Sequence, residues 1–308
     1  MRGIEHNPRC ASLHIGPWFI EPRWFCSAVA AFKAGSLPVI ADIEARSADV
    51  SQRKPYVVDR DGIATLLISG HMTKGDSKYG GTNSVRVRQA SRMVNSDEEV
   101  GGVMIVIDSP GGSVAGTEAL GDDIAAITKP KHSFIEDLGA SAAYWAASQT
   151  EHITVNPTGE VGSIGTLAII DDESKKYEAE GIKTHIISTG EYKGALVPGV
   201  EITENAIGVV REIVGAMNDR FLQAVSRGRN MSMKDVQAIA TGRTWVGQDA
   251  KARGLVDAVG SADQAYDYLA SLIDKKSSSE GRKTASAETR IRLAKSLLTC
   301  GQGDDRKI

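Results

Sequence analysis

The sequence predicts an α/β domain, because apolar runs typical of buried strands alternate with segments whose apolar residues recur at helical spacing. Residues 63–69 (IATLLIS) and 100–109 (VGGVMIVIDS) have the short, apolar character of buried strands. Residues 84–98 and 116–128 follow them in turn and are compatible with amphipathic helices. Two strand and helix units in this order favour a sheet that is covered by helices.

The alternation continues along the chain. Residues 131–137 and 152–156 predict short strands on either side of a helix at 141–148, and further strands are expected at 166–171 and 183–188. After Glu201 the pattern becomes helical. One apolar stripe runs through seven turns and comprises Ile202, Ala206, Val209, Ile213, Met217, Phe221 and Val225.

Two later helices have capping signals at their first turns. Ser232 and Asp235 form a capping box, and Ser261 is placed to cap a final helix of the domain. Polar segments then suggest the limits of the domain. We expect residues 1–60 to be an N-terminal arm and linker, residues 61–273 the main domain, and residues 274–308 a Ser-rich linker with a short amphipathic tail.

The composition limits the classes of function. A formal net charge of −3 argues against a nucleic-acid or anionic-membrane binder, since such proteins have a clear basic excess. The three cysteines lack metal-ligand spacing, which argues against a zinc site and a disulfide framework and favours a reducing compartment. No stretch reaches the ~20 apolar residues of a spanning helix. We therefore expect a cytoplasmic protein without a membrane partner.

An exposed backbone corner follows the strand at 100–109. Ser109-Pro110-Gly111-Gly112 combines a fixed proline dihedral with two residues that lack a side chain. Backbone N–H groups at this corner lie at the carboxyl edge of the sheet, where ligands of α/β proteins bind. One interpretation is an oxyanion hole. The alternative is an ordinary tight turn before a helix, which is the commoner meaning of such a sequence.

Ser141 lies between small residues where the next strand leads into a helix. A nucleophile benefits from this position, because the helix dipole and free N–H groups stabilise negative charge. The alternative is a helix cap, which is a common role of serine.

A serine nucleophile requires a base. His71, His132 and His152 lack an evident acid partner or lie within strands. Lys193 is the other candidate, because it lies in a Gly-bounded loop with apolar neighbours that would desolvate its amine. A solvated loop lysine is the alternative. Ser163, between glycines in VGSIG, is placed to orient such an amine or simply to form a turn.

Taken together, these motifs resemble the signal peptide peptidase A family of serine proteases. DSPGG, GASAAYWAAS, VGSIG, STGEYKGAL and GRTWVGQDAKARGLVD occur in this order, and the resemblance covers roughly residues 60–273. It implies that Ser141 is the nucleophile, Lys193 the general base and Ser163 the residue that orients this base. It also implies an oxyanion hole at Gly112 and Ala142. Gly111 and Ser113, beside this hole, are expected to contact substrate.

The resemblance also implies a fold, an assembly and a setting. The fold would be the Clp protease/crotonase-like fold of repeated ββα units, with no metal or nucleotide cofactor. The active site would form between neighbouring copies of a homo-oligomeric ring, with Ser141 and Lys193 from adjacent protomers. The chain is most similar in layout to phage capsid maturation proteases, so we expect capsid, portal or scaffold proteins as substrates, in the host cytoplasm within the assembling prohead.

Three alternatives to this function stay open. One is a soluble bacterial signal-peptide-peptidase-like enzyme that degrades proteins. Another is a crotonase-like acyl-CoA enzyme, which would have no use for a Ser/Lys pair. The third is a non-catalytic capsid scaffold. A related hypothesis is that the enzyme cuts its own exposed linker at residues 277–288 (SSSEGRKTASAE).

Overall fold

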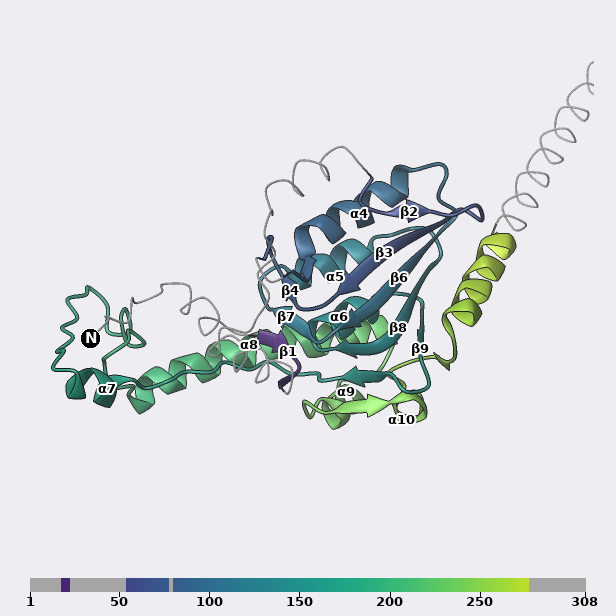
Figure 1. The fold of residues 1–308 in the computed structure, drawn as a ribbon. Helices are drawn as coiled ribbons and strands as arrows, with labels where there is room; N and C mark the ends of the chain where they lie inside the picture. Colours follow the sequence, from purple (N-terminus) through teal and green to yellow (C-terminus); the bar gives the residue numbers. More distant parts are fainter. Residues whose placement is uncertain (1–17, 23–53, 78–79, 277–308) are drawn as a thin grey trace, which may run out of the picture.

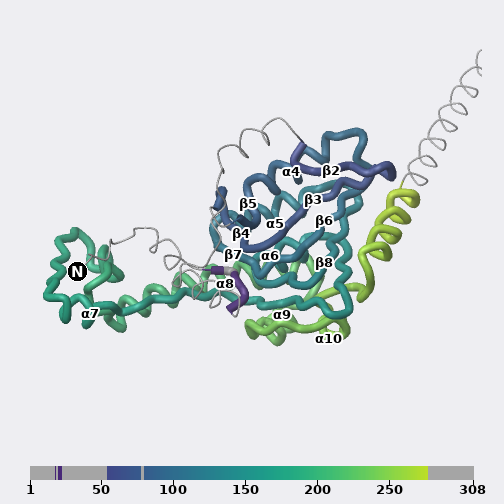
Figure 2. Tube along the Cα trace, in the orientation of Figure 1, coloured from purple at the N-terminus to yellow at the C-terminus, as the bar shows by residue number. Residues whose placement is uncertain are grey.

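The computed structural model describes residues 18–22, 54–77 and 80–276 (Figure 1). Most of the expected N-terminal arm, the Ser-rich linker with its hypothetical cleavage segment, and the amphipathic tail lie outside these residues. The described part has a body built on two β-sheets and a helical arm that projects from it (Figures 1 and 2).

The main sheet is largely parallel. Its strand order is β11 (Thr244–Val246), β10 (Glu160–Gly162), β8 (Lys131–Ala140), β6 (Gly102–Ser109), β3 (Ile63–Ser69) and β2 (Val57–Val58). The four inner strands of this path run parallel, and the two edge strands run antiparallel to their neighbours. The first half of β8 also pairs with β9 (His152–Val155), which pairs in turn with β12 (Ala258–Val259).

A second, smaller sheet lies beyond the carboxyl ends of the main strands. Its order is β1 (Trp18–Ile20), β7 (Gly111–Ser113), β4 (Met72–Thr73) and β5 (Thr82–Asn83). The chain thus passes from β3 through β4 and β5 into α4 (Ser84–Ser96), and from β6 through β7 into α5 (Thr117–Ala125). The predicted α/β class is confirmed, and these two successive segments are the expected ββα units. The third segment is shorter, because β8 leads directly into α6 (Ala142–Ala147).

Neighbouring side chains of the central strand enter two different cores, since successive residues of a strand point to opposite faces. Ile105 belongs to the larger core, together with Val94 of α4 and Leu120 of α5. Met104 belongs to a smaller core with Leu269, which lies in the helical segment 262–276. Helices therefore cover both faces of the main sheet.

Local sequence signals account for several helix starts. The Ser232 hydroxyl accepts the Asp235 N–H at the start of α9 (Met233–Ile239), as predicted. Ser261 and Gln264 exchange side-chain to backbone hydrogen bonds at the start of the last described helix, which confirms the predicted cap. A further short helix, α10 (Gly247–Ala252), follows β11.

The projecting arm consists of α7 (Ser174–Ala179), the chain up to residue 203 and the first part of α8 (Glu204–Arg229) (Figure 1). The predicted long helix is confirmed as α8, but its buried residues are concentrated near its end, where Phe221 and Val225 pack on the body. The strands expected at 166–171 and 183–188 are wrong: Leu167 forms one isolated bridge, and 183–188 forms none. Most of these residues lie in the arm, where no strand of the described chain offers hydrogen-bond partners.

Candidate active site

Three adjacent strands end at one edge of the main sheet. Ser109 of β6 is in register with Gly139 of β8, and Ala140 of β8 is in register with Gly162 of β10. Because these strands are parallel, the segments that follow them all leave from the carboxyl edge. The sheet thereby brings together the corner at 110–113, Ser141 and Ser163, which are far apart in the sequence.

The corner after β6 depends on two glycines. Gly111 has a φ of 92°, in the region that favours glycine. Gly112 of β7 is in register with Met72 of β4. A Cβ at Gly112 would lie 1.9 Å from the Met72 carbonyl oxygen. The Ser109 hydroxyl donates to the Gly70 carbonyl at 2.6 Å and accepts the Gly111 N–H at 3.1 Å. These contacts make the corner part of the small sheet. They also leave no room for a side chain at position 112.

Ser141 occupies a strained position between β8 and α6. Its φ of 55° and ψ of −118° fall outside the favoured regions for a residue with a Cβ. Its N–H donates to the Gly162 carbonyl at 2.8 Å, and its carbonyl accepts the Trp145 N–H at 2.9 Å. These backbone bonds hold the residue in place, so the strain is compatible with a defined orientation of its hydroxyl.

The Ser141 hydroxyl does not cap the helix. It accepts no N–H from α6, and within the described part of the chain its Oγ is buried without a hydrogen-bond partner. The ordinary explanation for a serine at this position, a side-chain cap, does not apply. Because an unpaired buried hydroxyl carries a free-energy cost, this serine requires a different explanation.

Ser163 follows β10 beside Ser141. Its backbone is also left-handed, with a φ of 51°, and its N–H donates to the Arg243 carbonyl at 2.7 Å. The preceding Gly162 has a φ of 125°, and a Cβ there would lie 2.7 Å from the same carbonyl oxygen. The close approach of residues 243–244 thus fixes the turn that carries Ser163.

Lys193 does not join these residues within one chain. It lies between α7 and α8 in a segment of the arm that projects away from α6 (Figures 1 and 2). Its side chain is exposed, and so are its apolar neighbours Leu196 and Val197. The desolvated pocket expected around this amine is therefore absent from the single described chain.

None of the three candidate histidines takes the place of Lys193 as a base beside Ser141. His132 and His152 are in register on β8 and β9, toward the amino end of β8, and their rings pack near Tyr268. Burial lowers the pKa of both, that of His132 to about 3. His71 lies between β3 and β4, and burial lowers its pKa as well. No hydrogen bond joins any of the three to the Ser141 hydroxyl.

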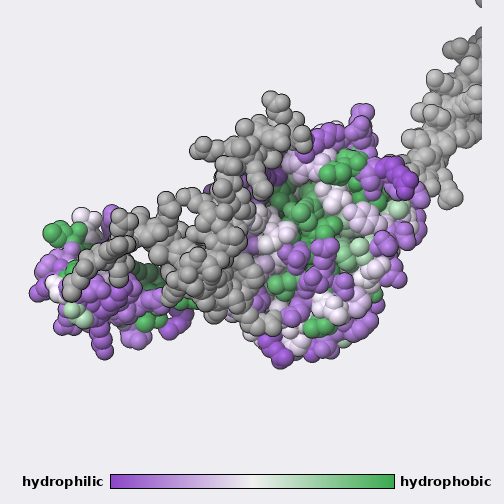
Figure 3. Space-filling view, in the orientation of Figure 1, coloured by the Kyte–Doolittle hydropathy of each residue, from purple (hydrophilic) through white to green (hydrophobic). Residues whose placement is uncertain are grey.

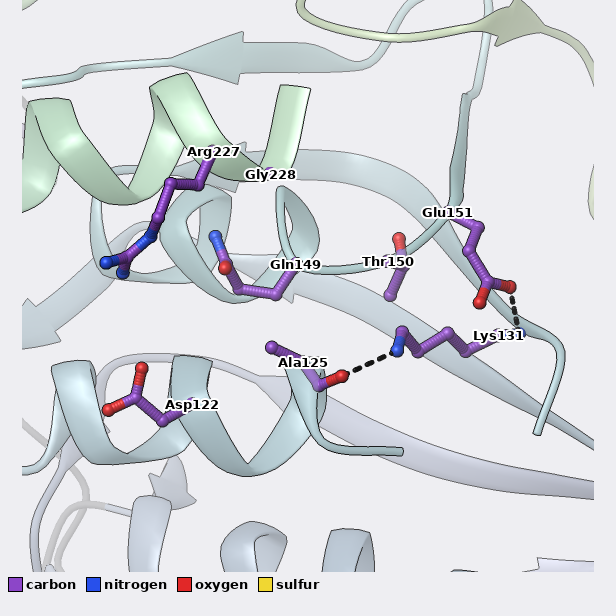
Figure 4. A pocket seen from close by; sticks show the side chains of 8 residues that line it. All are labelled: Asp122, Ala125, Lys131, Gln149, Thr150, Glu151, Arg227 and Gly228. Atoms are coloured by element: carbon purple, nitrogen blue, oxygen red, sulfur yellow. Dashed lines mark hydrogen bonds between the residues drawn. The ribbon is translucent and has the colours of Figure 1, made fainter. Parts of the chain in front are cut away.

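A pocket of about 430 Å³ lies at the opposite edge of the sheet (Figure 4). It is lined by polar side chains that include Asp122, Lys131, Glu151 and Arg227. Lys131 begins β8, whereas Ser141 follows the other end of that ten-residue strand. Lys131 is also engaged, since its amine donates to the Ala125 and Ile127 carbonyls. The pocket is therefore separate from the serine site.

The sequence interpretation missed one element at this edge. Strand β1 (Trp18–Ile20) pairs with β7 alongside the corner at 111–113. Trp18–Ile20 is a short apolar stretch, but its partner strand lies more than ninety residues away in the sequence. Only the folded chain shows which strand it joins.

The described chain contains no helix with the length and apolar character needed to cross a membrane. It also contains no cluster of three His, Cys, Asp or Glu side chains able to hold a metal ion.

The protein has an α/β fold with an unpaired buried serine at the carboxyl edge of its sheet, and sequence comparison identifies its family. Residues 124–276, about half of the chain, match the family described as Peptidase family S49. The chain belongs to this peptidase family, which confirms the placement expected from the motifs.

Three relatives illustrate the range of the family. Protease 4 of Haemophilus influenzae is 27% identical over 219 residues, which cover 70% of this chain and 35% of the relative. The chloroplastic serine protease SPPA of Arabidopsis thaliana is 28% identical over 215 residues, which cover 67% of this chain and 32% of the relative. Capsid assembly protease C of Escherichia phage lambda is 27% identical over 250 residues, covering 77% and 56%. The chain thus spans about a third to somewhat over half of the length of these relatives.

Among solved structures, a mutant of ClpP1 from Listeria monocytogenes is similar at 16% identity. The similarity covers 65% of this chain and 92% of that one, with a TM-score of 0.43.

Proposed function

We propose that this protein is a serine endopeptidase in which Ser141 is the nucleophile and Lys193 of a neighbouring copy is the general base. The observation that carries the proposal is the Ser141 hydroxyl: it is buried without a hydrogen-bond partner, on a strained backbone, at the edge where ligands of α/β sheets bind. A nucleophile whose base comes from another copy would have an unpaired hydroxyl of this kind in the single chain.

The arm supports the involvement of a second copy. Hydrophobic side chains are exposed along it, among them Ile187 at 99%, Ile182 at 49% and Leu196 at 47% (Figure 3). A projecting element with such a surface is suited to pack on another protein surface. Packing on the next copy would bury these side chains and remove water from Lys193. Desolvation favours the neutral amine, which is the form that accepts a proton.

The reaction would be acyl transfer. The neutral Lys193 amine takes the Ser141 proton as the Ser141 oxygen attacks a peptide carbonyl. The developing oxyanion accepts hydrogen bonds from the N–H groups of Gly112 and Ala142. The Lys193 ammonium then donates its proton to the leaving amine, and the peptide C–N bond breaks. Water then attacks the acyl-enzyme and gives up a proton to Lys193. The Lys193 ammonium returns this proton to the Ser141 oxygen as the ester bond breaks, which releases the acid and restores the free enzyme. Ser163 would orient the lysine, while Gly111 and Ser113 would contact the substrate backbone.

We infer that the substrates are proteins of an assembling phage head, namely capsid, portal or scaffold proteins, and that the setting is the host cytoplasm. The capsid assembly protease of phage lambda is matched over 77% of this chain, which supports this choice. The relatives named Protease 4 and SPPA favour a second candidate, a soluble peptidase of more general protein degradation. Incubation of the protein and its Ser141→Ala variant with proteins encoded beside it separates the two.

A mixing experiment tests the shared site without knowledge of the substrate. Ser141→Ala and Lys193→Ala proteins, each alone, should not be labelled by a fluorophosphonate probe. Co-assembled in equal amounts, they should regain about a quarter of parental labelling, because a ring completes a site when a chain with Ser141 meets a neighbour with Lys193. All of the label must lie on the Lys193→Ala chain. No labelling on mixing would contradict the shared site.

A matched substitution tests the base itself. Lys193→Arg keeps a basic side chain of similar reach, but the guanidinium does not deprotonate, so the variant should be as unreactive as Lys193→Ala. Parental labelling of the arginine variant would eliminate Lys193 as the base. Parental labelling of every variant except Ser141→Ala would point to another activator. A parent protein that resists the probe would favour the crotonase-like or scaffold alternatives.

A further inference from the structure

The chain places its own N-terminal strand along the proposed oxyanion corner. In β1, Trp18, Phe19 and Ile20 are in antiparallel register with Ser113, Gly112 and Gly111 of β7. The Glu21 N–H extends this pairing by donating to the Pro110 carbonyl at 2.7 Å. The segment thus lies against the same backbone that the proposed reaction assigns to substrate and oxyanion.

The other edge of this strand is paired as well. The Trp18 N–H donates to the Leu167 carbonyl at 2.8 Å, and the Leu167 N–H donates to the Trp18 carbonyl at 3.1 Å. The segment is therefore an inserted strand, held between β7 on one edge and residue 167 on the other. Pairing of an extended peptide with the edge of a strand is a mode of peptide recognition in which the main chain provides much of the affinity.

Two side chains on the same face of the inserted segment are buried. Trp18 is 8% exposed and Ile20 is 2% exposed, and both pack with Leu167. Residues two apart on a strand point to the same face, so this groove accepts apolar groups at alternate positions. The carboxyl-terminal neighbour Glu21 is also buried, at 6% exposure.

We propose that Trp18–Glu21 is a built-in pseudosubstrate, and that the groove between β7 and Leu167 selects extended peptides with apolar side chains two residues apart. The inference rests on the proposed function in one respect, namely that this groove leads a peptide to Ser141. Since an attached segment competes at an effective concentration in the millimolar range, a substrate must displace it to bind. The resting chain is therefore self-inhibited.

Binding of a peptide in trans tests the proposal without turnover. The probe is a fluorescein-labelled peptide with the sequence of residues 16–22, GPWFIEP, and the full-length protein has the Ser141→Ala substitution. Adding Trp18→Asp and Ile20→Asp to this protein should release the inserted strand. The peptide should then bind at least about tenfold more tightly, because its attached competitor is gone. Fluorescence anisotropy measures the change.

Two controls make the result specific. A peptide with aspartate in place of its tryptophan and isoleucine should not bind the released groove. Val57→Asp introduces the same acidic group at an edge-strand residue that is 74% exposed, and should leave peptide binding as in the Ser141→Ala parent. Equal peptide affinity with and without the two β1 substitutions, or no binding to either protein, would overturn the proposal.

Hydrogen exchange keeps the test decisive if the substituted protein does not fold. In the unsubstituted chain the amide protons of Trp18, Glu21 and Leu167 should exchange slowly, and excess free peptide should accelerate exchange at Trp18 and Glu21 only. Fast exchange at these two amides without peptide would refute insertion. Fluorophosphonate labelling of the Trp18→Asp/Ile20→Asp protein with Ser141 intact separates the two hypotheses: peptide binding without labelling of Ser141 would reject the peptidase and retain the groove as a peptide-binding site that the N-terminal strand occupies.

Discussion

Removing the Ser141 hydroxyl should stabilise the protein. The Oγ atom is buried and lacks a hydrogen-bond partner in the described chain, so folding removes it from water without replacing its hydrogen bonds. An unsatisfied buried polar group of this kind costs about 1–3 kcal/mol. Ser141→Ala should therefore raise the free energy of unfolding by about 1 kcal/mol, the lower end of that range, because the methyl group of alanine leaves the hydroxyl's small volume empty.

Ser148 provides a control in the same helix. Ser141 and Ser148 flank α6 at its two ends, and both are fully buried. The Ser148 hydroxyl donates to the Trp145 carbonyl at 2.7 Å and accepts from the Gln149 side chain at 2.8 Å. Ser148→Ala breaks both bonds and should lower the free energy of unfolding by about 1 kcal/mol. The two substitutions remove the same atom and should act in opposite directions.

Urea unfolding of dilute protein measures both effects. Dilution matters because a neighbouring copy would supply the Lys193 amine to Ser141 in an assembly, and the hydroxyl would then have a partner. Parallel thermal unfolding should show Ser141→Ala shifted upward by about 2–4 °C, the shift expected per kcal/mol for a domain of about 200 residues. A Ser141→Ala protein that is as destabilised as Ser148→Ala would show that the hydroxyl is paired, and the argument for an unpartnered nucleophile would fail.

Other parts of the structure give further expected outcomes. Gly112→Ala should reduce fluorophosphonate labelling at least about a hundredfold, because its Cβ would collide with the Met72 carbonyl and move an oxyanion donor; Gly75→Ala, whose Cβ has no neighbour within 4 Å, should label like the parent. Burial lowers the pKa of His132 to about 3 from 6.5, so its contribution to stability is complete above pH 6.5 and is lost as the pH falls toward 3. Urea titrations should show this contribution decreasing by up to about 1.4 kcal/mol per pH unit, and His132→Gln should reduce the measured slope by that amount, while the part due to His152, whose pKa burial also lowers, should remain. Asp257→Ala should lower the free energy of unfolding by about 3–5 kcal/mol, because it leaves the buried Arg229 guanidinium without its two 2.8 Å bonds; a loss below 1 kcal/mol in urea would contradict this account.

Much of the body follows from local patterns. The strand at 63–69 and the helix that begins at residue 84 occur where the apolar periodicity predicts them. Capping at Ser232 and Ser261 is equally local, because each cap joins residues three positions apart. Such features depend on neighbours within one turn or one strand, so they can be inferred without knowledge of the fold.

The arm shows where this inference fails. Residues 183–188 have the apolar character of a strand, but a strand also needs hydrogen-bond partners from elsewhere in the chain. The same limit applies to Lys193, whose sequence neighbours are apolar but exposed in the single chain. Apolar composition near a residue therefore does not establish that its side chain is buried, since burial depends on which surface packs against it.

The sequence by itself determined the α/β class, the glycine corner before Ser113 and the position of Ser141 at a junction between strand and helix, because backbone sterics and periodicity act over a few residues. Only the tertiary structure decided that the Ser141 hydroxyl is not a helix cap, that Lys193 lies on a projecting arm, and that Trp18–Ile20 pairs with β7. These features depend on hydrogen bonds and packing between segments distant in the sequence. Those contacts form only when the whole sheet is assembled.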